Sequence, residues 1–157
     1  MAKLLKLYIG NKNYSSWSMR PWVLMKQVGI AFDEHMVRFD DFSSDSSFKK
    51  TMAKLCPTGK VPVLADGNLM IWDSLAIVEY LAERFSSMHL WPQDTHARGL
   101  ARSICAEMHS GFAALRAAYP MNIEASLPHI GGLLLRDRAA VRNDLARIDQ
   151  MWSSLLQ

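Results

Sequence analysis

Cysteine is scarce in this sequence, and the two residues, Cys56 and Cys105, lie far apart in the chain. Neither belongs to a CxxC pair and no histidine stands at ligand spacing, so neither a disulfide framework nor a metal site is indicated. The sequence also lacks an apolar N-terminal segment typical of a secretory signal, and no apolar run approaches the length that spans a bilayer. These absences favour a protein of the reducing cytoplasm with no metal and no membrane partner.

Blocks of like charge are missing too. The formal net charge of the 157 residues is +3 and the pI is about 9.0, but lysine and arginine are scattered along the whole chain. A nucleic-acid-binding protein would show a basic block or a stripe with interleaved aromatics, so we expect no nucleic-acid partner. With 50% apolar and 21% charged residues, the composition is typical of a globular protein.

The first half of the chain predicts alternating strands and helices. Apolar alternation predicts a strand from Leu5 to about Gly10, and Pro21 suits the first turn of a helix that Gly29 ends, with Ser18 near its cap. The further predicted elements are a strand over 32–39, a short helix over 48–55, strands over 61–65 and 69–72 joined by an Asp66-Gly67 hairpin, and a helix from Asp73-Ser74 to about Arg84. The order βαβ, a link, then ββα predicts an α/β domain of the thioredoxin fold.

The second half predicts helices alone. Apolar residues recur at helical spacing from Leu100 to Leu115 and again from Val141 to Leu155, with a looser segment that contains Pro128 and Gly131-Gly132 between them. We predict a thioredoxin-like domain over 1–85, a linker over 86–93 and an incomplete all-helical domain over 94–157. Because two amphipathic helices rarely close a core alone, we expect them to pack on the first domain, on absent helices or on another chain.

Three stretches together resemble the glutathione transferase superfamily: YSSWSMRP at 14–21, TGKVPVL at 58–64 and DSLAIVEYL at 73–81. The first resembles the Ser-Ser loop of the serine-type classes, above all zeta, which includes maleylacetoacetate isomerases. The second is similar to the superfamily's Val-cis-Pro turn, and the third to its acidic-or-Gln-Ser-x-Ala-Ile helix start. Members normally continue past the point where this sequence stops, so we expect either a fragment or helices that complete themselves by oligomerising.

The resemblance implies a cytoplasmic, homodimeric transferase that binds glutathione as thiolate and conjugates or isomerises small electrophiles. Maleylacetoacetate isomerase-like activity is one form of this reaction. The alternative is a non-catalytic glutathione-binding or protein-interaction module of the same fold. A glutaredoxin-like oxidoreductase is disfavoured, because the loop at 14–21 lacks the cysteine that disulfide exchange requires.

Serine chemistry explains the first of the three motifs. Only the thiolate of glutathione is a good nucleophile, and a hydroxyl at a helix N-terminus can donate a hydrogen bond to it, helped by the helix dipole. The resemblance assigns this role to Ser15, with Ser16 as the second candidate. Both serines also suit an ordinary turn and cap.

The resemblance assigns further residues to the ligand. A cis Val61-Pro62 bond would expose the backbone of Val61 to the cysteinyl residue of glutathione as an added strand does. Asp73 and Ser74 stand at a helix N-terminus that suits the γ-glutamyl carboxylate, although Asp-Ser is also a plain N-cap. The remaining candidates are Lys60 for the glycyl carboxylate, Tyr14 and Trp17 in the serine loop, and Glu107, His109 and Arg116 for the electrophile pocket.

Overall fold

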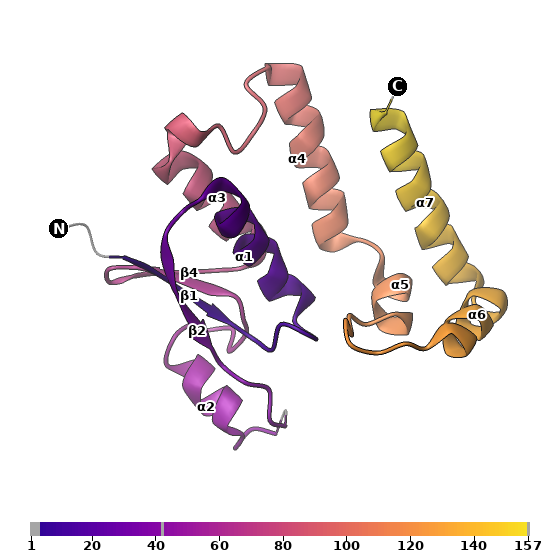
Figure 1. Cartoon of the computed structure of the whole chain (residues 1–157), viewed down its shortest axis with the longest axis horizontal. Helices are drawn as coiled ribbons and strands as arrows, with labels where there is room; N and C mark the ends of the chain where they lie inside the picture. The colour runs from indigo at the N-terminus through magenta and orange to yellow at the C-terminus, as the bar shows by residue number, and fades with distance from the viewer. Residues whose placement is uncertain (1–3, 42, 157) are drawn as a thin grey trace. The chain divides into compact units, whose positions relative to one another are not determined.

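The computed structural model describes residues 4–41 and 43–156, and it divides the chain into two compact units that meet between Trp91 and Pro92. The first unit carries all the strands that the structure describes, and the second is helical (Figure 1). In the described part of the chain, no helix combines the length and the apolar character needed to cross a membrane.

The first unit is a four-stranded mixed sheet in the order β2-β1-β3-β4. Strand β2 runs parallel to β1, while β3 is antiparallel to both of its neighbours, β1 and β4. The elements in chain order are β1 (Leu5–Ile9), α1 (Ser16–Val28), β2 (Phe32–Met36), α2 (Ser47–Ala53), β3 (Val63–Asp66), β4 (Leu69–Trp72), α3 (Ser74–Arg84) and a 3₁₀ turn (Ser86–Met88). The predicted thioredoxin-like arrangement is therefore confirmed.

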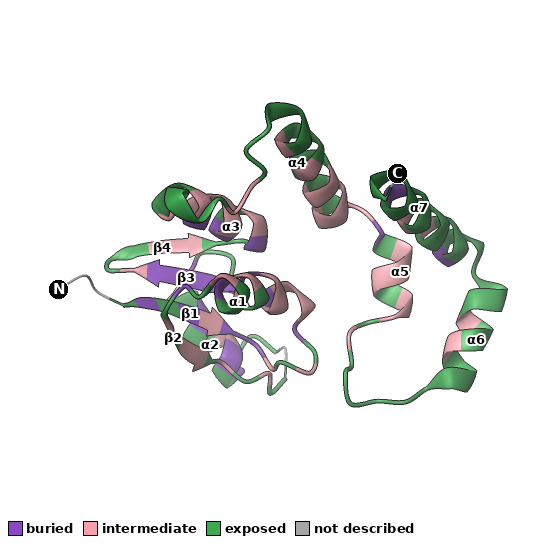
Figure 2. Ribbon diagram, turned by 45° about the horizontal axis from the view of Figure 1, so that its top comes forward, coloured by how far each residue is buried: buried purple, intermediate pink, exposed green. Residues whose placement is uncertain are grey.

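Two hydrophobic clusters hold the sheet between its helices. Because side chains alternate across a strand, Leu64 faces α1 and α3 while its neighbour Val63 faces α2. Leu7, Met25 and Ile77 are fully buried in the larger cluster beside Leu64. Figure 2 shows the buried residues gathered in the sheet and on the inner sides of α1 and α3. The clusters fix both helices against one face of the sheet.

Helix α1 begins earlier than the sequence predicts. Its first residue is Ser16, so Pro21 lies inside the helix and not in its first turn. The backbone N–H of Met19 bonds the carbonyl of Ser15 at 3.1 Å, so a helical turn forms ahead of the proline. The helix then loses only the hydrogen bond that a residue other than proline would donate at position 21. It ends as predicted at Gly29, whose φ of 75° is left-handed.

The other predicted boundaries in the first unit differ by a few residues. Strand β2 ends at Met36 and not at residue 39, and the backbone of Phe39 is held by the side chain of Asn11 at 2.7 Å. Strand β3 begins at Val63, after the proline, because Pro62 has no N–H for a sheet ladder. The Asp66-Gly67 hairpin and the helix over Ser74–Arg84 are as predicted.

The second unit contains four helices in its described residues: α4 (Thr95–Ser110), α5 (Ala113–Ala118), α6 (Pro128–Asp137) and α7 (Ala139–Leu155). Helix α7 packs against α5 and α6. The side chain of Asp144 on α7 accepts a 2.9 Å hydrogen bond from the Leu115 backbone N–H in the first turn of α5, and Val141 and Met151 of α7 are buried. This unit therefore has a small core of its own around α7.

Two predictions in this half are wrong. The apolar stretch from Leu100 to Leu115 is not one helix, because α4 ends at Ser110 and Phe112 adopts a left-handed φ of 62° before α5 begins. The segment around Pro128 is not loose, because it forms α6 with Gly131 and Gly132 inside it. Proline is well suited to the first position of a helix, and the three leucines that follow the glycines are good helix formers.

A cluster of three polar side chains ties the β3–β4 hairpin to α3. The carboxylate of Asp66 accepts hydrogen bonds from the Tyr80 hydroxyl at 2.7 Å and from Nε of Arg84 at 2.9 Å. These two hydrogen bonds lower the pKa of the Asp66 carboxyl below its ordinary value, and the charge of Arg84 adds to the effect. The cluster anchors the strands that lead into the site described below.

We predict that Asp66→Asn lowers the free energy of unfolding by about 1 kcal/mol at neutral pH. The pKa of Asp66 is lowered in the folded state, so this stabilisation is fully present above the ordinary carboxyl pKa and is lost as the pH falls through the folded-state value. Urea unfolding of the unaltered protein and of Asp66→Asn, from neutral to acid pH, measures the difference in their free energies of unfolding. Asp45→Asn, at a side chain that is 91% exposed, is the control. A difference in free energy of unfolding that stays unchanged in acid would show that the ionised Asp66 carboxylate is not its source.

Candidate functional site

The strand register brings the three sequence motifs to one edge of the sheet. Val63 pairs with Tyr8 near the end of β1 and with Trp72 at the end of β4. The loop after β1, the segment before β3 and the start of α3 therefore share that edge. Helices α1 and α3, which pack against each other, both have their N-termini there (Figure 1). Each helix N-terminus contributes a partial positive charge there, and the Asp73 carboxylate accepts two of the N–H groups of α3.

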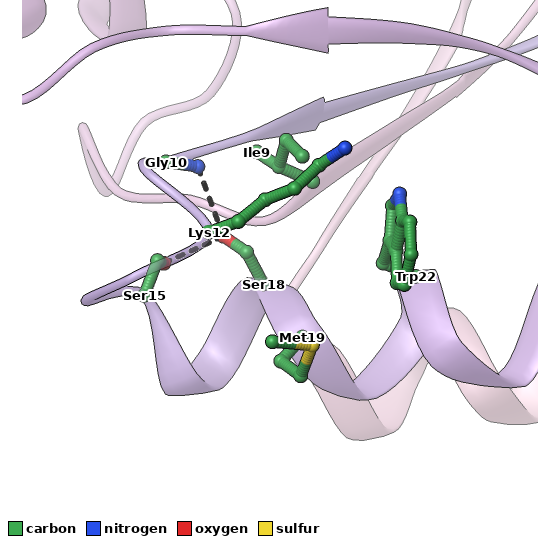
Figure 3. A pocket seen from close by; sticks show the side chains of 7 residues that line it. All are labelled: Ile9, Gly10, Lys12, Ser15, Ser18, Met19 and Trp22. Atoms are coloured by element: carbon green, nitrogen blue, oxygen red, sulfur yellow. Dashed lines mark hydrogen bonds between the residues drawn. The ribbon is translucent and has the colours of Figure 1, made fainter. Parts of the chain in front are cut away.

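Ser15 is the N-cap residue of α1, and its hydroxyl lies in a small polar network. It is 7% exposed and donates a 2.7 Å hydrogen bond to Oγ of Ser18, which also accepts the backbone N–H of Gly10 at 3.1 Å. Figure 3 shows both hydrogen bonds, from Gly10 and from Ser15, ending at the Ser18 oxygen. Ser15 makes no side-chain capping bond to α1 within the described residues. Its oxygen is thus held by a neighbouring side chain and not by the helix backbone.

A cavity of about 10 Å³ lies against these two serines, lined also by Ile9, Gly10, Lys12, Met19 and Trp22 (Figure 3). It has room for a water molecule and is far too small for a tripeptide. The cavity itself therefore cannot hold a peptide ligand.

Lys12, which lines the cavity, forms an ion pair with Glu34. Nζ of Lys12 lies 2.7 Å from Glu34 and 4.8 Å from the centre of the Trp22 ring, and Trp22 Nε1 donates to Glu34 at 2.6 Å. Burial raises the pKa of Glu34, but the hydrogen bonds from Lys12 and Trp22 outweigh it and the net pKa is lowered. Glu34 is therefore ionised at neutral pH and compensates the charge of Lys12.

The Val61-Pro62 peptide bond is cis, as the sequence resemblance predicts. Val61 is half-buried and Pro62 is buried, directly ahead of β3. Cys56 packs in the smaller hydrophobic cluster and its thiol donates to the Lys60 carbonyl at 3.4 Å. This contact fixes the backbone of the turn, while the side chain of Lys60 is exposed.

Asp73 combines a capping role with a strained backbone. Its Oδ1 accepts hydrogen bonds from the N–H groups of Leu75 at 2.8 Å and Ala76 at 3.4 Å. Its φ of 78° and ψ of 133° lie in a region that residues with a Cβ rarely adopt. Such a conformation costs about 1–3 kcal/mol and is concentrated at functional sites.

Ser74, the first residue of α3, has a buried hydroxyl with no hydrogen-bond partner in the described part of the chain. The residue is 2% exposed. A buried unsatisfied hydroxyl costs about 1–3 kcal/mol, so its persistence calls for an explanation. A ligand oxygen at the N-terminus of α3 would supply the missing partner.

The remaining predicted residues of the first unit lie in the same loop as Ser15. Tyr14 is 53% exposed, Ser16 is half-buried as the first residue of α1, and the half-buried ring of Trp17 lies 4.2 Å from the guanidinium carbon of Arg20. The sequence interpretation did not assign Ser18 to the site. The signal was its spacing of three residues from Ser15, which places both hydroxyls on one side of the first helical turn.

The three candidates for an electrophile pocket lie in the second unit, where Glu107 and Arg116 contact other residues of that unit. Glu107 is bridged to Arg147 by hydrogen bonds of 2.6 and 2.8 Å, and this partner lowers the pKa of the carboxyl. Arg116 donates to the carbonyls of Gly111 and Met108, which closes the end of α4. Nδ1 of His109 is buried. Among residues 4–41 and 43–156, no group of three or more histidine, cysteine or acidic side chains is placed to hold a metal ion.

We predict that Asp73→Gly is more stable than Asp73→Ala, by about 1 kcal/mol. Both variants lose the carboxylate that caps α3. Glycine adopts the φ of 78° without strain, whereas alanine in the same backbone conformation remains strained. At an ordinary helix position the order is the reverse. Thermal and urea unfolding measure the difference. An alanine variant at least as stable as the glycine variant would show that the strain is absent.

Comparison with known proteins relates the first unit to a known family. The family described as Glutathione S-transferase, N-terminal domain matches residues 14–84, which contain all three motifs. Glutathione S-transferase Z1 of Arabidopsis thaliana is 41% identical over 96 residues, a match that covers 57% of this chain and 41% of that relative. The chain spans between 23% and 62% of the length of the plant and bacterial relatives that it matches.

Solved structures share the fold. Glutathione S-transferase unclassified 2 from Bombyx mori superposes with a TM-score of 0.68 at 21% identity, over 97% of this chain and 68% of the other. A glutathione transferase homolog from Burkholderia with bound glutathione superposes with a TM-score of 0.59 at 22% identity, over 92% of this chain and 97% of the other. Residues 14–84 therefore match a glutathione S-transferase N-terminal domain, and the chain is similar in sequence and fold to members of the glutathione S-transferase superfamily.

Proposed function

We propose that this chain binds glutathione at the sheet edge shared by Ser15, Val61 and Ser74, and holds it as thiolate for attack on a small electrophile. The observation that carries the proposal is the convergence of two helix N-termini and the backbone before β3 at that edge. Each of these features suits a different part of the tripeptide. The bound glutathione of the Burkholderia relative supports the same ligand for this chain.

The ligand is assigned from its chemistry. The γ-glutamyl carboxylate lies at the N-terminus of α3, where it accepts from the Ser74 hydroxyl, and Asp73 faces the amino group. The cysteinyl backbone pairs with Val61 as an added strand does, and Lys60 attracts the glycyl carboxylate. The sulfur then lies at the N-terminus of α1 beside Ser15. Tyr14 and Trp17 border it from the same loop.

The proposed role of Ser15 has a magnitude that suffices for catalysis. An ordinary thiol has a pKa of about 8.5, so only a few per cent is thiolate at neutral pH. A hydrogen bond to a charged group contributes about 1.5–3 kcal/mol, which equals about one to two pKa units. One donor therefore brings the bound thiol close to half ionised at neutral pH. The thiol proton leaves to water, and the sulfur lone pair attacks the electrophile.

For the second unit we propose a role in binding the electrophile, and for the whole protein a homodimeric assembly. Glu107, His109 and Arg116 are proposed to border the electrophile, and the reaction is conjugation or, as in the zeta-like resemblance, isomerisation. A cytoplasmic homodimer is the proposed form of the protein. The natural electrophile is sought first among small aryl halides and unsaturated ketones, which react directly with thiolates.

We predict that Ser15→Ala raises the pKa of the bound glutathione thiol by about one to two units and lowers kcat about tenfold or more, while the Kd for glutathione stays nearly unchanged. The reason is that only the ionised sulfur uses the donor. The ultraviolet absorbance of the thiolate across a pH series measures the pKa, and conjugation of a generic aryl halide measures kcat.

Ser16→Ala tests the neighbouring hydroxyl in the same assays. A normal thiol pKa in Ser15→Ala with a raised one in Ser16→Ala would move the role to Ser16. Binding of glutathione with an unperturbed thiol and no conjugation in the unaltered protein would favour the alternative, a non-catalytic glutathione-binding module.

We predict that Ser74→Ala weakens glutathione binding about tenfold and leaves the melting temperature unchanged or higher. The hydroxyl has no partner in the described residues of the ligand-free protein, so its removal leaves no group unsatisfied. In the complex, the same change removes a hydrogen bond to a carboxylate. Calorimetric titration and thermal unfolding measure the two effects. A loss of stability with normal affinity would show that Ser74 is structural only.

A further inference from the structure

Ser18 stands between a fixed backbone donor and the hydroxyl assigned to the sulfur. Its side chain is 3% exposed, and it contacts Gly10 N–H at 3.1 Å and Ser15 Oγ at 2.7 Å. Figure 3 shows the Ser18 oxygen at the meeting point of both bonds. The hydroxyl of Ser15 thus has a buried polar neighbour whose oxygen is held by a backbone N–H.

The backbone donor at Gly10 is held in place by packing. A Cβ at position 10 would come within 2.4 Å of Cζ of Phe39, so the strand end lies directly against that ring. Phe39 is itself fixed by its N–H bond to Asn11. The Gly10 N–H therefore points at Ser18 from a rigid position at the end of β1.

If Ser15 donates to the sulfur of glutathione as proposed, it can no longer donate to Ser18. Each hydroxyl carries one hydrogen, and the hydrogen of Ser15 is now donated to Ser18. If Ser15 turns its hydrogen to the sulfur, its oxygen still lies 2.7 Å from Ser18 and needs a donor from that side. Ser18 can supply one by rotating its own hydrogen, because its oxygen continues to accept from Gly10.

We propose that Ser18 is a positioning residue for the thiolate, which reverses its hydrogen bond with Ser15 on glutathione binding. This inference rests on the proposed role of Ser15. The resulting chain runs from Gly10 N–H to Ser18, from Ser18 to Ser15 and from Ser15 to the sulfur. Successive hydrogen bonds polarise one another, by about 10–30% per bond, so Ser18 strengthens the last one. Hydrogen bonds rotate, but no proton is transferred along the chain.

Among the groups that line the cavity beside Ser18, its own hydroxyl is the one placed to affect Ser15. The charged side chain that lines the adjoining cavity is Lys12, and Glu34 compensates its charge from β2. Met19 and Ile9 line the same cavity with apolar groups. If Ser18 served only to join β1 to α1, its loss would lower stability without changing the ionisation of a bound thiol.

The test compares Ser15→Ala, Ser18→Ala and the double variant in the pKa of the bound glutathione thiol, measured from thiolate absorbance. We expect Ser18→Ala to raise this pKa by about half a unit, less than the one to two units of Ser15→Ala. The double variant is expected to match Ser15→Ala, because Ser18 acts only through Ser15. The Kd for glutathione stays within about twofold in Ser18→Ala.

Ser46→Ala is the matched control. Ser46 is 5% exposed and also accepts one backbone N–H, that of Lys49, at 3.1 Å, but it caps α2 and does not contact Ser15. It is expected to lose stability with an unchanged thiol pKa. Ser18→Cys, which keeps a weak donor of similar size, serves if Ser18→Ala does not fold, and its shift is expected to be the smaller of the two.

The outcomes separate the two proposals. A normal thiol pKa in Ser15→Ala would overturn the proposed function itself. A raised pKa in Ser15→Ala with an unchanged one in Ser18→Ala, or in Ser18→Cys if only that variant folds, would overturn the role of Ser18. Fully additive shifts in the double variant would also overturn it, because Ser18 would then act on the sulfur independently of Ser15.

Discussion

The pairing of Val63 with both Tyr8 and Trp72 is the constraint on which the site depends. It sets the end of β1, the start of β3 and the end of β4 level with one another. A shift of one residue in either pairing would move Leu64 and Val63 to the opposite faces of the sheet, so the hydrophobic clusters on the two faces enforce this register. The core thereby determines where the polar groups meet, although none of them belongs to it.

The same edge carries costs that the rest of the domain offsets. Asp73 has an unfavourable backbone conformation, and the hydroxyl of Ser74 is buried without a partner among the described residues. Both lie at the start of α3, next to the β3–β4 hairpin, which the Asp66–Tyr80–Arg84 cluster holds against the helix. Strain and unsatisfied groups are tolerated at sites that bind a ligand, because interactions with the ligand offset the lower stability of the free protein there. This is the pattern expected of a preorganised ligand site.

Much of the fold could be predicted from the sequence, because periodicity and turn residues act locally. The thioredoxin-like order, the Gly29 helix end and the Asp66-Gly67 hairpin followed from such signals. The start of α1, the break at Phe112 and helix α6 did not, because Pro21, Phe112 and the Gly131-Gly132 pair adopt conformations that their residue types do not usually favour. At the site, the motifs identified Ser15, Val61 and Ser74, but Ser18 emerged only from hydrogen-bond geometry. The proposed electrophile residues in the second unit had no comparably specific motif.

The most direct test of the account is a crystal structure of the protein soaked with glutathione. We expect the sulfur within hydrogen-bonding distance of Ser15 Oγ, the cysteinyl backbone alongside Val61 and the γ-glutamyl carboxylate against Ser74 at the start of α3. Glutathione bound away from this edge, or no bound glutathione at saturating concentration, would contradict the account.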